Sequence, residues 1–480
     1  MRDLANDAWL RDLTPAFDAR GKAAERLRRV FDGNGVIIST GQQAALFGGP
    51  LYTLTKALSA LAFADVLERG TGVSIAPVFW AATDDADFEE AASARIAVIA
   101  EVRTLRLPAA TQAAVAMNDV LMPGVEQLIE RLADACGSVV DPTVLDDVRE
   151  CYTSRTTLGA AYVAQMRRLL EPLGIAVIDA SHPALRRASS PVLQRALERA
   201  VSVEQALRQR YDAIRAAGYS PQVDHLPELS LVFSATPGEP KERIPVRDAS
   251  SMASRAPETL GPNVLLRPIV ERFIMPSAAY VAGPGETAYF AQVSAVAEAL
   301  DLATPLPVPR WSVTLIEPRI ERLLSRLGIS RDELRDRQTV ETKLARQALP
   351  SAVSQALQRL RHQIGADVAA LEVIDRDNLI PAASLQGLRR SWLHRVERAE
   401  RRYVAAVKRK EADLVRDIGT AAAALYPEGE RQERVLNFVP FIARYGRALI
   451  EQMKVEAERH AMLALGTAAT DLTVSIAERV

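Results

Sequence analysis

Cysteine is scarce in this sequence, with Cys136 and Cys151 as its two examples among 480 residues. They lie 15 positions apart, with no C-x-x-C pair and no cluster of histidines, so neither a disulfide framework nor a zinc site is indicated. So few thiols suit a reducing compartment, and we expect a cytoplasmic protein. The first residues, MRDLANDAWLRDL, are charged throughout and lack the apolar core of a signal peptide.

Long hydrophobic runs and a dominant charge are also missing. No uncharged apolar stretch of about 18 residues occurs, so we expect no membrane span. Lysine and arginine total 59 against 60 acidic residues, a net charge of −1 that provides no basic field for nucleic acid. The chain does have 48% hydrophobic residues, enough for sizeable cores, and its length suggests about three domains.

The segment GVIISTGQQAALFGGPLYTLTK, residues 35–56, is the most informative part of the chain. Its pattern predicts a buried strand over 36–38, a turn over 39–43, the glycine pair Gly48 and Gly49, and a helix opened by Pro50. Such a unit presents backbone N–H groups and the positive end of a helix dipole to an anion or carboxylate. The alternative is a tight packing turn, because neither standard nucleotide-binding glycine motif is present.

The side chains of this segment favour a ligand site over a packing turn. Gln42 and Gln43 offer long amide groups that a structural turn does not need. The predicted helix is amphipathic, with leucines along one side, and Lys56 lies on the other side about two turns from its start. We therefore expect Lys56 to meet an anion near the glutamines, and the alternative is an ordinary solvated lysine.

An acidic cluster follows the next predicted strand, residues 73–80. The cluster is TDDADFEEA, residues 83–91, and it contains Asp84, Asp85 and Asp87. Ligands of open α/β sheets lie beyond the carboxyl ends of the strands, so these carboxylates are well placed for general-base chemistry or for capture of an amine. The alternative is an acidic helix N-terminus that complements the helix dipole. Carboxylates also bind divalent metals, but we assign no metal site here.

Strands and helices alternate through the first two thirds of the chain, which is the α/β pattern. We expect a hairpin over 95–107 and further strands over 174–179, 265–270 and 278–283. The last third is helical, and apolar residues at helical spacing over 353–374 and 385–406 predict an antiparallel coiled-coil arm.

Four blocks of the sequence resemble the BshC family, whose members are proposed to add cysteine in bacillithiol biosynthesis. The blocks are TGQQAALFGGPLYTLTKA, PVFWAATDDADFEEA, LLRPIVERFIMPSAAYVAGPGETAYFAQ and ERVLNFVPFIARYG. The resemblance implies a Rossmann-like core similar to class I aminoacyl-tRNA synthetases and nucleotidyltransferases, with inserted modules and a C-terminal α-helical coiled coil that pairs two subunits. It also implies an ATP-linked ligase that joins the carboxyl group of cysteine to the amine of glucosaminyl-malate.

The resemblance divides the chain into seven segments. The Rossmann-like core takes 1–110, 174–217 and 263–317; a helical insertion takes 111–173, a loop-rich module 218–262, the helical coiled-coil domain 318–430, and a C-terminal segment that packs back on the core 431–480.

The resemblance also implies site residues. The catalytic candidates are Lys56, Asp84, Asp85 and Asp87. The substrate-binding candidates are Gly41, Gln42, Gln43, Gly49, Tyr52, Gly283, Glu286 and Tyr289, and the candidates for ATP or ADP are Asn437, Arg444 and Tyr445. The family pattern commonly has a histidine within the acidic block, at the position where this chain has Ala86.

Two other hypotheses stand beside the ligase. One is an enzyme of the same fold that activates or transfers an amino acid with another substrate. The other is a non-catalytic dimeric binding protein built around the coiled coil, and the alanine at position 86 is the reason to retain it. Under the ligase hypothesis the partners are cysteine, glucosaminyl-malate and a second copy of the chain, with no nucleic acid and no membrane.

Overall fold

The structure is a computed structural model that describes residues 8–108, 114–138, 140–375, 377 and 379–466, together with the backbone of 472–475. The described residues form two compact units. The core unit takes its residues from 1–96, 103–315 and 432–476, and the helical unit takes its residues from 97–102 and 316–431.

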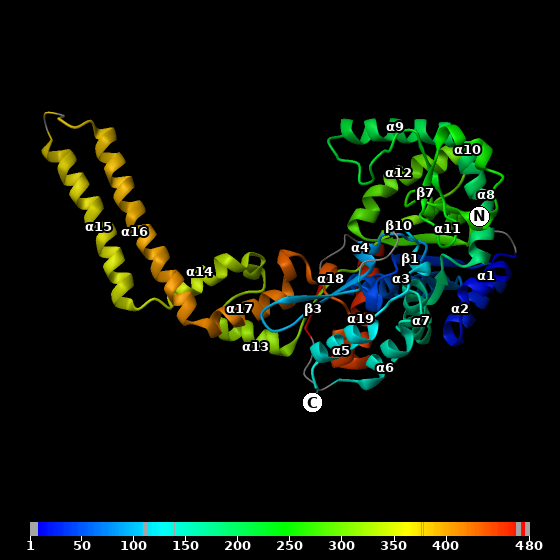
Figure 1. The fold of residues 1–480 in the computed structure, drawn as a ribbon, viewed down its shortest axis with the longest axis horizontal. Helices are drawn as coiled ribbons and strands as arrows, with labels where there is room; N and C mark the ends of the chain where they lie inside the picture. The colour runs from blue at the N-terminus through cyan, green and yellow to red at the C-terminus, as the bar shows by residue number, and fades with distance from the viewer. Residues whose placement is uncertain are drawn as a thin grey trace. The chain divides into compact units, whose positions relative to one another are not determined.

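A five-stranded parallel sheet forms the centre of the core unit, in the order β10-β9-β1-β2-β5 (Figure 1). Its strands are β10 (Leu306–Pro309), β9 (Ser277–Ala282), β1 (Val36–Gln43), β2 (Ile75–Ala82) and β5 (Ala176–Asp179). Because all four pairings are parallel, the carboxyl ends of the strands lie along one edge of the sheet. This arrangement confirms the predicted Rossmann-like α/β class.

Helices pack on both faces of the sheet. One face carries Ile37, Val78 and Trp80, which belong to a buried cluster with residues of several helices, among them α1 (Trp9–Phe17), α2 (Gly21–Asp32), α8 (Pro183–Glu198), α11 (Arg267–Ile274) and α12 (Pro284–Leu300). Side chains alternate between faces along a strand, so Phe79 points the other way, toward Tyr162 of α7 (Leu158–Leu170). Helix α3 (Leu51–Thr71) packs against β1 and β2, and α19 (Val439–Gly466) packs on α3.

Among its described residues, the core unit contains further helices and three smaller sheets. The helices are α4 (Phe88–Ala91), α5 (Val125–Cys136), α6 (Pro142–Cys151), α9 (Ala200–Ala216), α10 (Val246–Met252) and α18 (Gln432–Val435). The smaller sheets are β3 (Ser93–Ala97) with β4 (Val102–Arg106), β7 (Glu242–Pro245) with β6 (Leu229–Ser234) and β8 (Leu260–Pro262), and β11 (Val313–Ile316) with β12 (Leu472–Ser475). The hairpin predicted over 95–107 is confirmed as β3 and β4.

The turn predicted over residues 39–43 is wrong, because these residues continue strand β1. The ladder to β2 extends as far as the pair Gln43 and Ala82. On the other side, the hydroxyl of Thr40 donates to the carbonyl oxygen of Val281 at 2.9 Å. Because the buried hydroxyl of Thr40 has this acceptor, the sheet tolerates a polar residue at this position. Gln42 and Gln43 therefore form the end of strand β1.

The strand predicted over 265–270 is also wrong, because helix α11 begins at Arg267. The side-chain oxygen of Asn263 accepts hydrogen bonds from the backbone N–H groups of Leu265 and Leu266, at 3.2 and 3.0 Å, which starts the chain into a helix. Pro268 then occupies the first turn, where its missing N–H is not needed. A short apolar run does not by itself distinguish a strand from a buried helix.

Helix α3 does not have the amphipathic character that its leucines predicted. From Leu51 to Ala64 nearly every side chain is buried, including the polar Thr53, Thr55 and Ser59. The reason is long-range, since α19 covers the side of α3 that the sheet does not. Lys56 is accordingly only 4% exposed, which excludes the solvated lysine.

The glycine pair forms a packing turn. Gly48 and Gly49 have φ angles of +80° and +83° and connect β1 to α3. The N–H of Gly48 donates to the Tyr152 hydroxyl at 3.1 Å, and the N–H of Leu51 donates to the carbonyl of Leu436 at 2.8 Å. A Cβ on Gly48 would lie 2.7 Å from Cε1 of Phe438. The start of α3 is therefore closed by protein groups, and the expectation of an anion site there is not met.

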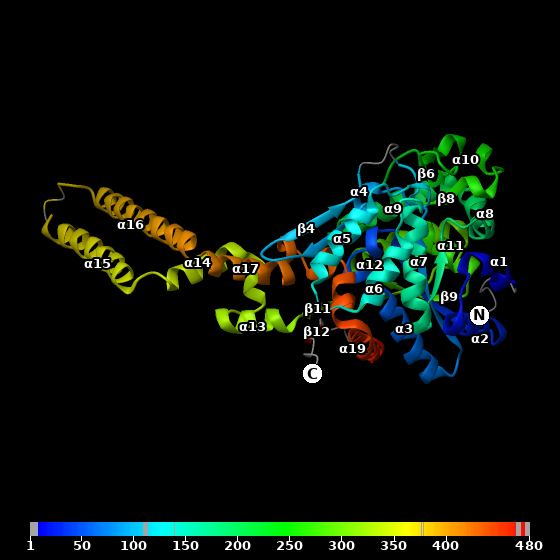
Figure 2. The same cartoon turned by 60° about the horizontal axis from the view of Figure 1, so that its bottom comes forward.

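The helical unit consists of α13 (Pro318–Leu327), α14 (Arg337–Gln347), α15 (Ser351–Ile374), α16 (Ala382–Lys410) and α17 (Ala412–Leu425). Helices α15 and α16 lie side by side as a long hairpin in both ribbon views (Figure 1, Figure 2). The residues buried along them are Leu357, Val368, Leu385, Val396 and Val404. The predicted coiled coil is confirmed. Within the described part of the chain, no helix combines the length and apolar character needed to cross a membrane.

We predict that Gly48→Ala destabilises the core more than Gly72→Ala, although both glycines have positive φ angles. Each alanine has to adopt the left-handed conformation, which costs about 1–2 kcal/mol. At Gly48 the new methyl group also meets Phe438, and overpacking adds about 1–3 kcal/mol, whereas the space around Gly72 is open. Urea unfolding of both variants measures the difference, and equal losses would contradict the packing role.

Candidate active site

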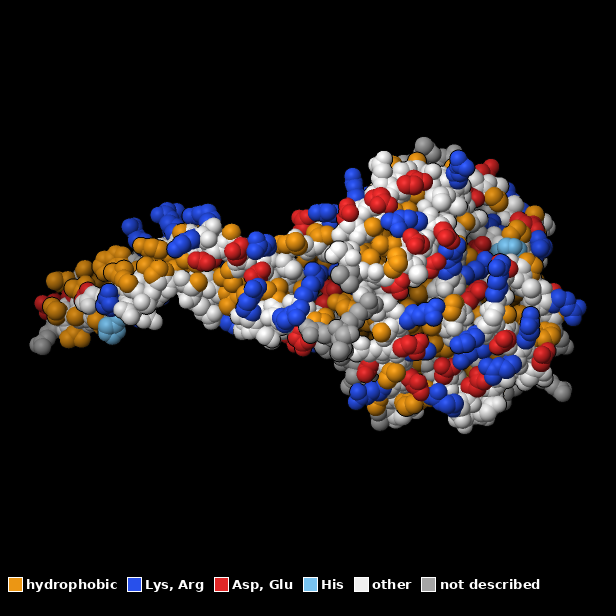
Figure 3. Space-filling model, turned by 90° about the horizontal axis from the view of Figure 1, so that it is seen from below, with side chains coloured by type: hydrophobic (Ala, Val, Ile, Leu, Met, Phe, Trp, Pro, Cys, Tyr) orange, Lys and Arg blue, Asp and Glu red, His pale blue; other side chains and the backbone are white. Residues whose placement is uncertain are grey.

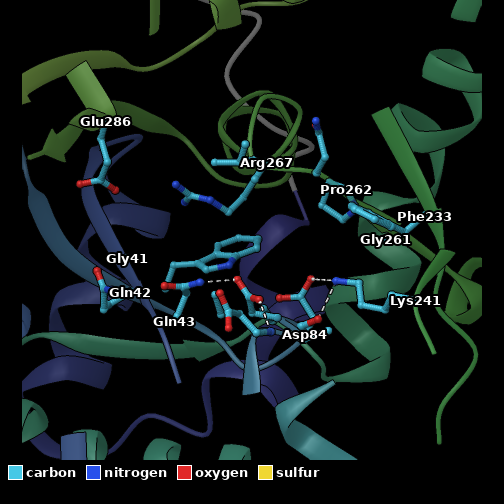
Figure 4. Close-up of a pocket in the computed structure, with 18 of the residues that line it drawn as sticks. Gly41, Gln42, Gln43, Asp84, Phe233, Lys241, Gly261, Pro262, Arg267 and Glu286 are labelled. Atoms are coloured by element: carbon cyan, nitrogen blue, oxygen red, sulfur yellow. Dashed lines mark hydrogen bonds and ion pairs between the residues drawn. The ribbon is translucent and has the colours of Figure 1, made fainter. Parts of the chain in front are cut away.

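A cavity of about 710 Å³ opens at the carboxyl edge of the central sheet. Its walls come from the ends of β1 and β2, the start of α12, part of α8 and the module that the sequence delimited as 218–262. This edge is where open α/β sheets bind ligands. Figure 4 shows Gly41, Gln42 and Glu286 on one side of the cavity, with Phe233 and Lys241 on the other.

An ion pair between Lys56 and Glu286 joins the strand edge to two helices. The Lys56 ammonium lies 2.6 Å from the Glu286 carboxylate and donates to the Gly41 carbonyl at 2.9 Å and to Oε1 of Gln42 at 3.0 Å. Glu286 also accepts from the Gly283 N–H at 2.8 Å and from the Tyr280 hydroxyl at 2.7 Å. All three ammonium protons of Lys56 thus have protein acceptors.

Burial and pairing act in opposite directions on these two groups. Burial lowers the pKa of Lys56, and the neighbouring Glu286 carboxylate offsets that effect only in part. Burial also opposes ionisation of Glu286, but the charge and hydrogen bond of Lys56 outweigh it, so the pKa of Glu286 is lowered. The carboxylate therefore stays ionised in its buried position.

The three aspartates of the acidic cluster line the same cavity and have different partners. The carboxylate of Asp84 lies 3.5 Å from the Lys241 ammonium, which also donates to the Asp84 carbonyl at 2.6 Å. Asp85 accepts from Nε2 of Gln43 at 2.9 Å and from the backbone N–H of Asp87 at 3.0 Å. Asp87 caps α4, accepting from the N–H of Glu90 at 3.1 Å. The helix-cap alternative thus describes Asp87, whereas Asp85 is held at the end of the sheet.

Two tyrosines of the predicted set also line the cavity. Burial, with the negative charges of Glu90 and Glu286, raises the pKa of Tyr52 to about 12, and its hydroxyl accepts from Nε2 of Gln42 at 3.0 Å. Burial likewise raises the pKa of Tyr289 to about 12, although the nearby Arg267 lowers it. Both phenols therefore stay protonated at neutral pH and act as hydrogen-bonding groups.

Most of the predicted site residues meet in this cavity. The lining includes Gly41, Gln42, Gln43, Tyr52, Lys56, Asp84, Asp85, Asp87, Gly283, Glu286 and Tyr289. Ala86 lines it as well, so a methyl group stands at the position where the resemblance implied a histidine.

Four predicted residues do not line the cavity: Gly49, Asn437, Arg444 and Tyr445. Gly49 belongs to the packing turn. The amide of Asn437 donates to the carbonyl of Phe47 at 3.0 Å and accepts from the N–H of Val439 at 2.9 Å, so it joins the C-terminal segment to that turn.

Sequence inspection missed the cationic part of the cavity, which consists of Arg186, Lys241, Arg243, Arg267, Arg310 and Arg434. Arg267 pairs with the fully buried Glu271 at 3.1 Å, and Arg310 pairs with the buried Glu433 at 2.7 Å. Of the six, Arg267 and Arg434 lie in sequence blocks on which the family resemblance rests. Membership of those blocks is the sequence feature that could have identified these two as site residues. The other four lie in segments with no motif.

The parallel sheet, the cavity at its carboxyl edge and the appended helical hairpin define a Rossmann-like α/β protein with a coiled-coil domain. Comparison with known families agrees with that class. The profile "Bacillithiol biosynthesis BshC, N-terminal Rossmann-like domain" matches residues 4–311, and "Bacillithiol biosynthesis BshC, C-terminal coiled-coil domain" matches residues 313–462. The chain therefore belongs to the BshC family of bacillithiol biosynthesis.

Individual relatives cover most of the chain. Proteins named "Putative cysteine ligase BshC" from Koribacter versatilis and Salinibacter ruber are 31% and 30% identical to it. The alignments cover 89% and 88% of this chain, and 82% and 81% of the relatives. A solved structure titled as a "putative arginyl t-RNA synthetase" from Campylobacter jejuni matches with 10% identity and a TM-score of 0.25, over 94% of this chain and 100% of that chain.

We predict that the Lys56–Glu286 pair stabilises the core cooperatively. Lys56→Met and Glu286→Gln should each cost about 3–5 kcal/mol, because each leaves the other group buried without its partner. The double variant should cost at least about 1 kcal/mol less than the sum of the two. Urea unfolding monitored by tryptophan fluorescence measures all three.

The matched control is Lys454→Met, which removes a partly exposed lysine paired with Glu451 on α19. It should cost less than about 1 kcal/mol. Additive losses in the double variant would show that the two buried groups do not depend on each other.

Proposed function

We propose that this protein is a ligase that joins the carboxyl group of L-cysteine to the amine of glucosaminyl-malate, forming an amide bond. The main support for this proposal is the cavity, which is lined both by Asp84, Asp85 and Asp87 and by the Lys56–Glu286 pair. The names of the relatives, which describe cysteine ligases, support the same reaction class.

Asp85 is the carboxylate best placed to receive the amine. Lys241 already engages Asp84, and Asp87 caps a helix. Asp85 is oriented by Gln43 and by the N–H of Asp87, and each of its oxygens keeps acceptor capacity. In the proposed step the nitrogen of the amine forms a bond to the activated carboxyl carbon of cysteine. The bond from that carbon to its activated oxygen breaks, so that this oxygen leaves with the activating group, and Asp85 accepts the proton that the nitrogen loses.

For Lys56 we propose a positioning role in place of direct contact with the reacting atoms. Its ammonium has three protein acceptors and is nearly inaccessible. Through Gln42, whose amide reaches the Tyr52 hydroxyl, it fixes the wall of the cavity next to the acidic edge.

A free carboxylate has to be activated before an amine attacks it, and ATP is the activating agent that we propose. Of the residues predicted to bind a nucleotide, Asn437 is hydrogen-bonded to the turn that contains Gly48, and neither Arg444 nor Tyr445 lines the cavity. We therefore assign no residue to ATP and derive no step through it.

One observation favours the alternative of a binding protein without turnover. Ala86 faces the cavity at the position where the family pattern has a histidine, so a general acid or base at that point is missing from this chain. Under this alternative glucosaminyl-malate binds but no amide forms.

We predict that Asp85→Asn lowers kcat for ligation by about 100- to 10,000-fold, the range expected for loss of a general base. The assay supplies cysteine, glucosaminyl-malate and ATP and detects the thiol conjugate by mass spectrometry, with ATP omitted in a parallel series. Glu89→Gln, two residues beyond Asp87 and 80% exposed at its side chain, is the matched control and should keep full activity.

Unchanged turnover of Asp85→Asn would remove Asp85 from the reaction. Absence of product from the folded wild-type protein in every series would contradict the ligase and leave the binding protein.

We also propose that the chain forms a homodimer through the coiled coil. The hairpin of α15 and α16 carries exposed apolar side chains: Leu360, Leu371, Val373, Ile374, Leu388, Trp392 and Tyr403 are between 38% and 75% exposed. Figure 3 shows hydrophobic side chains gathered on this unit. Contiguous exposed apolar surface of this kind marks an interaction site, and a second copy of the same hairpin is the occupant we propose.

We predict that the double substitution Leu371→Glu/Ile374→Glu converts the dimer to a monomer, because two charges would be buried at the apolar contact. Light scattering after size-exclusion chromatography measures the mass. Arg398→Glu, at an exposed polar position of α16, should leave the dimer intact. A wild-type protein that elutes as a monomer would contradict the proposal.

A further inference from the structure

The module of residues 218–262 supplies a cationic wall to the cavity. Its strands β7, β6 and β8 form a three-stranded antiparallel sheet, and Phe233, Lys241 and Arg243 from it line the cavity. The Lys241 ammonium lies 5.0 Å from the centre of the Phe233 ring, and the Arg243 guanidinium carbon lies 5.4 Å from it. One aromatic ring thus holds two cations beside the same cavity.

Arg243 has no carboxylate partner in the part of the chain that the structure describes. Among the described residues no carboxylate lies within 4.0 Å of its guanidinium, which lies over the Phe233 ring. It is half-buried, and burial lowers its pKa. A guanidinium presents up to five donors in a planar fork that matches carboxylate geometry. A guanidinium that is partly shielded from water and has no counter-charge destabilises the fold unless an anion binds to it.

Arg186 of α8 adds a second uncompensated charge to the cavity lining. It is 9% exposed, and its Nη1 donates to the backbone carbonyls of Ala235 and Glu258 at 2.9 and 2.6 Å. No carboxylate lies within 4.0 Å of it in the described part of the chain. These two carbonyl groups hold Arg186 against the module, but they do not neutralise the positive charge of its guanidinium.

The cavity is therefore polarised along its length. The end of the sheet presents the carboxylates of Asp85 and Asp87, while the module presents Arg243 and α8 presents Arg186, which is hydrogen-bonded to the module. Lys241 lies between the two regions, since it reaches Asp84 from the module side (Figure 4). A molecule with an amine at one end and carboxylates at the other is complementary to this pattern of charge.

We infer that Arg243, assisted by Arg186, forms a carboxylate subsite that binds the acid half of the amine-bearing substrate. The inference rests on the proposed function in that the substrate is an amino sugar joined to a dicarboxylic acid. The subsite selects for the acid-bearing substrate and aligns it so that the amine reaches Asp85. Phosphate groups of a nucleotide share the anionic chemistry, and the experiment separates the two.

The test is isothermal titration calorimetry without ATP or cysteine, so that it does not depend on ligation. The probes are glucosaminyl-malate, methyl glucosaminide (which lacks the carboxylates) and ADP. Arg243→Gln should weaken glucosaminyl-malate binding by about 10- to 100-fold, the value of a charge-assisted hydrogen bond. It should leave methyl glucosaminide unchanged within about two-fold, since only the acid half meets Arg243.

Arg247→Gln is the matched control, because it removes an arginine of the same module whose side chain is 84% exposed. It should bind all three probes as the wild type does. The Arg243→Gln variant is folded if its thermal unfolding has the same midpoint temperature as that of the wild type.

Equal weakening of glucosaminyl-malate and methyl glucosaminide, or weakening of ADP alone, would overturn the carboxylate subsite. So would a wild-type protein that binds glucosaminyl-malate no better than methyl glucosaminide. Failure of ligation with a normal calorimetric result would contradict the ligase and leave the subsite standing. Normal ligation with an unchanged KM for glucosaminyl-malate in Arg243→Gln would overturn the subsite and leave the proposed ligase standing.

Discussion

The buried contact between Lys56 and Glu286 is the constraint on which the site depends. Lys56 comes from α3, its backbone acceptor Gly41 from the end of β1, and Glu286 from the first turn of α12. Three segments distant in sequence are therefore joined through one ammonium group at the edge of the sheet. An ammonium buried to this degree is unfavourable alone, and the carboxylate and two further acceptors offset that cost. The glutamines that follow Gly41 are consequently fixed in direction, and Gln43 in turn orients Asp85.

Around this contact the cavity separates its charges. Carboxylates lie where β2 ends, and the wall formed by the module and α8 carries Arg243 and Arg186, which have no carboxylate within 4.0 Å among the described residues. This separation gives the site a direction, and the proposed amide ligation requires one because only one end of the acceptor reacts. It also gives the module a role beyond covering the sheet. Under the proposed function, the core supplies the edge where the amine reacts, and the module binds the acid half of the acceptor.

Local pattern was sufficient to predict the buried strands near 36–38, 73–80 and 174–179 and the helical hairpin of the C-terminal third, because apolar periodicity is a property of neighbouring residues. It failed where distant segments decide the outcome. Residues 39–43 stay in a strand because β9 and β2 pair with them, and α3 is buried all round because α19 covers it. The glycine turn looked like an anion site, but Tyr152 and Leu436 close it. Arg186 and Arg243 carry no motif, and only the fold brings them to the cavity.

The central claim is that one polarised cavity holds the acceptor with its amine at the acidic edge and its carboxylates at the module wall. A crystal structure of the protein with glucosaminyl-malate tests it most directly. The account predicts the amine within hydrogen-bonding distance of Asp85, at about 2.7–3.2 Å, and a carboxylate on the guanidinium of Arg243. A ligand bound in the reverse orientation, or outside this cavity, would contradict it.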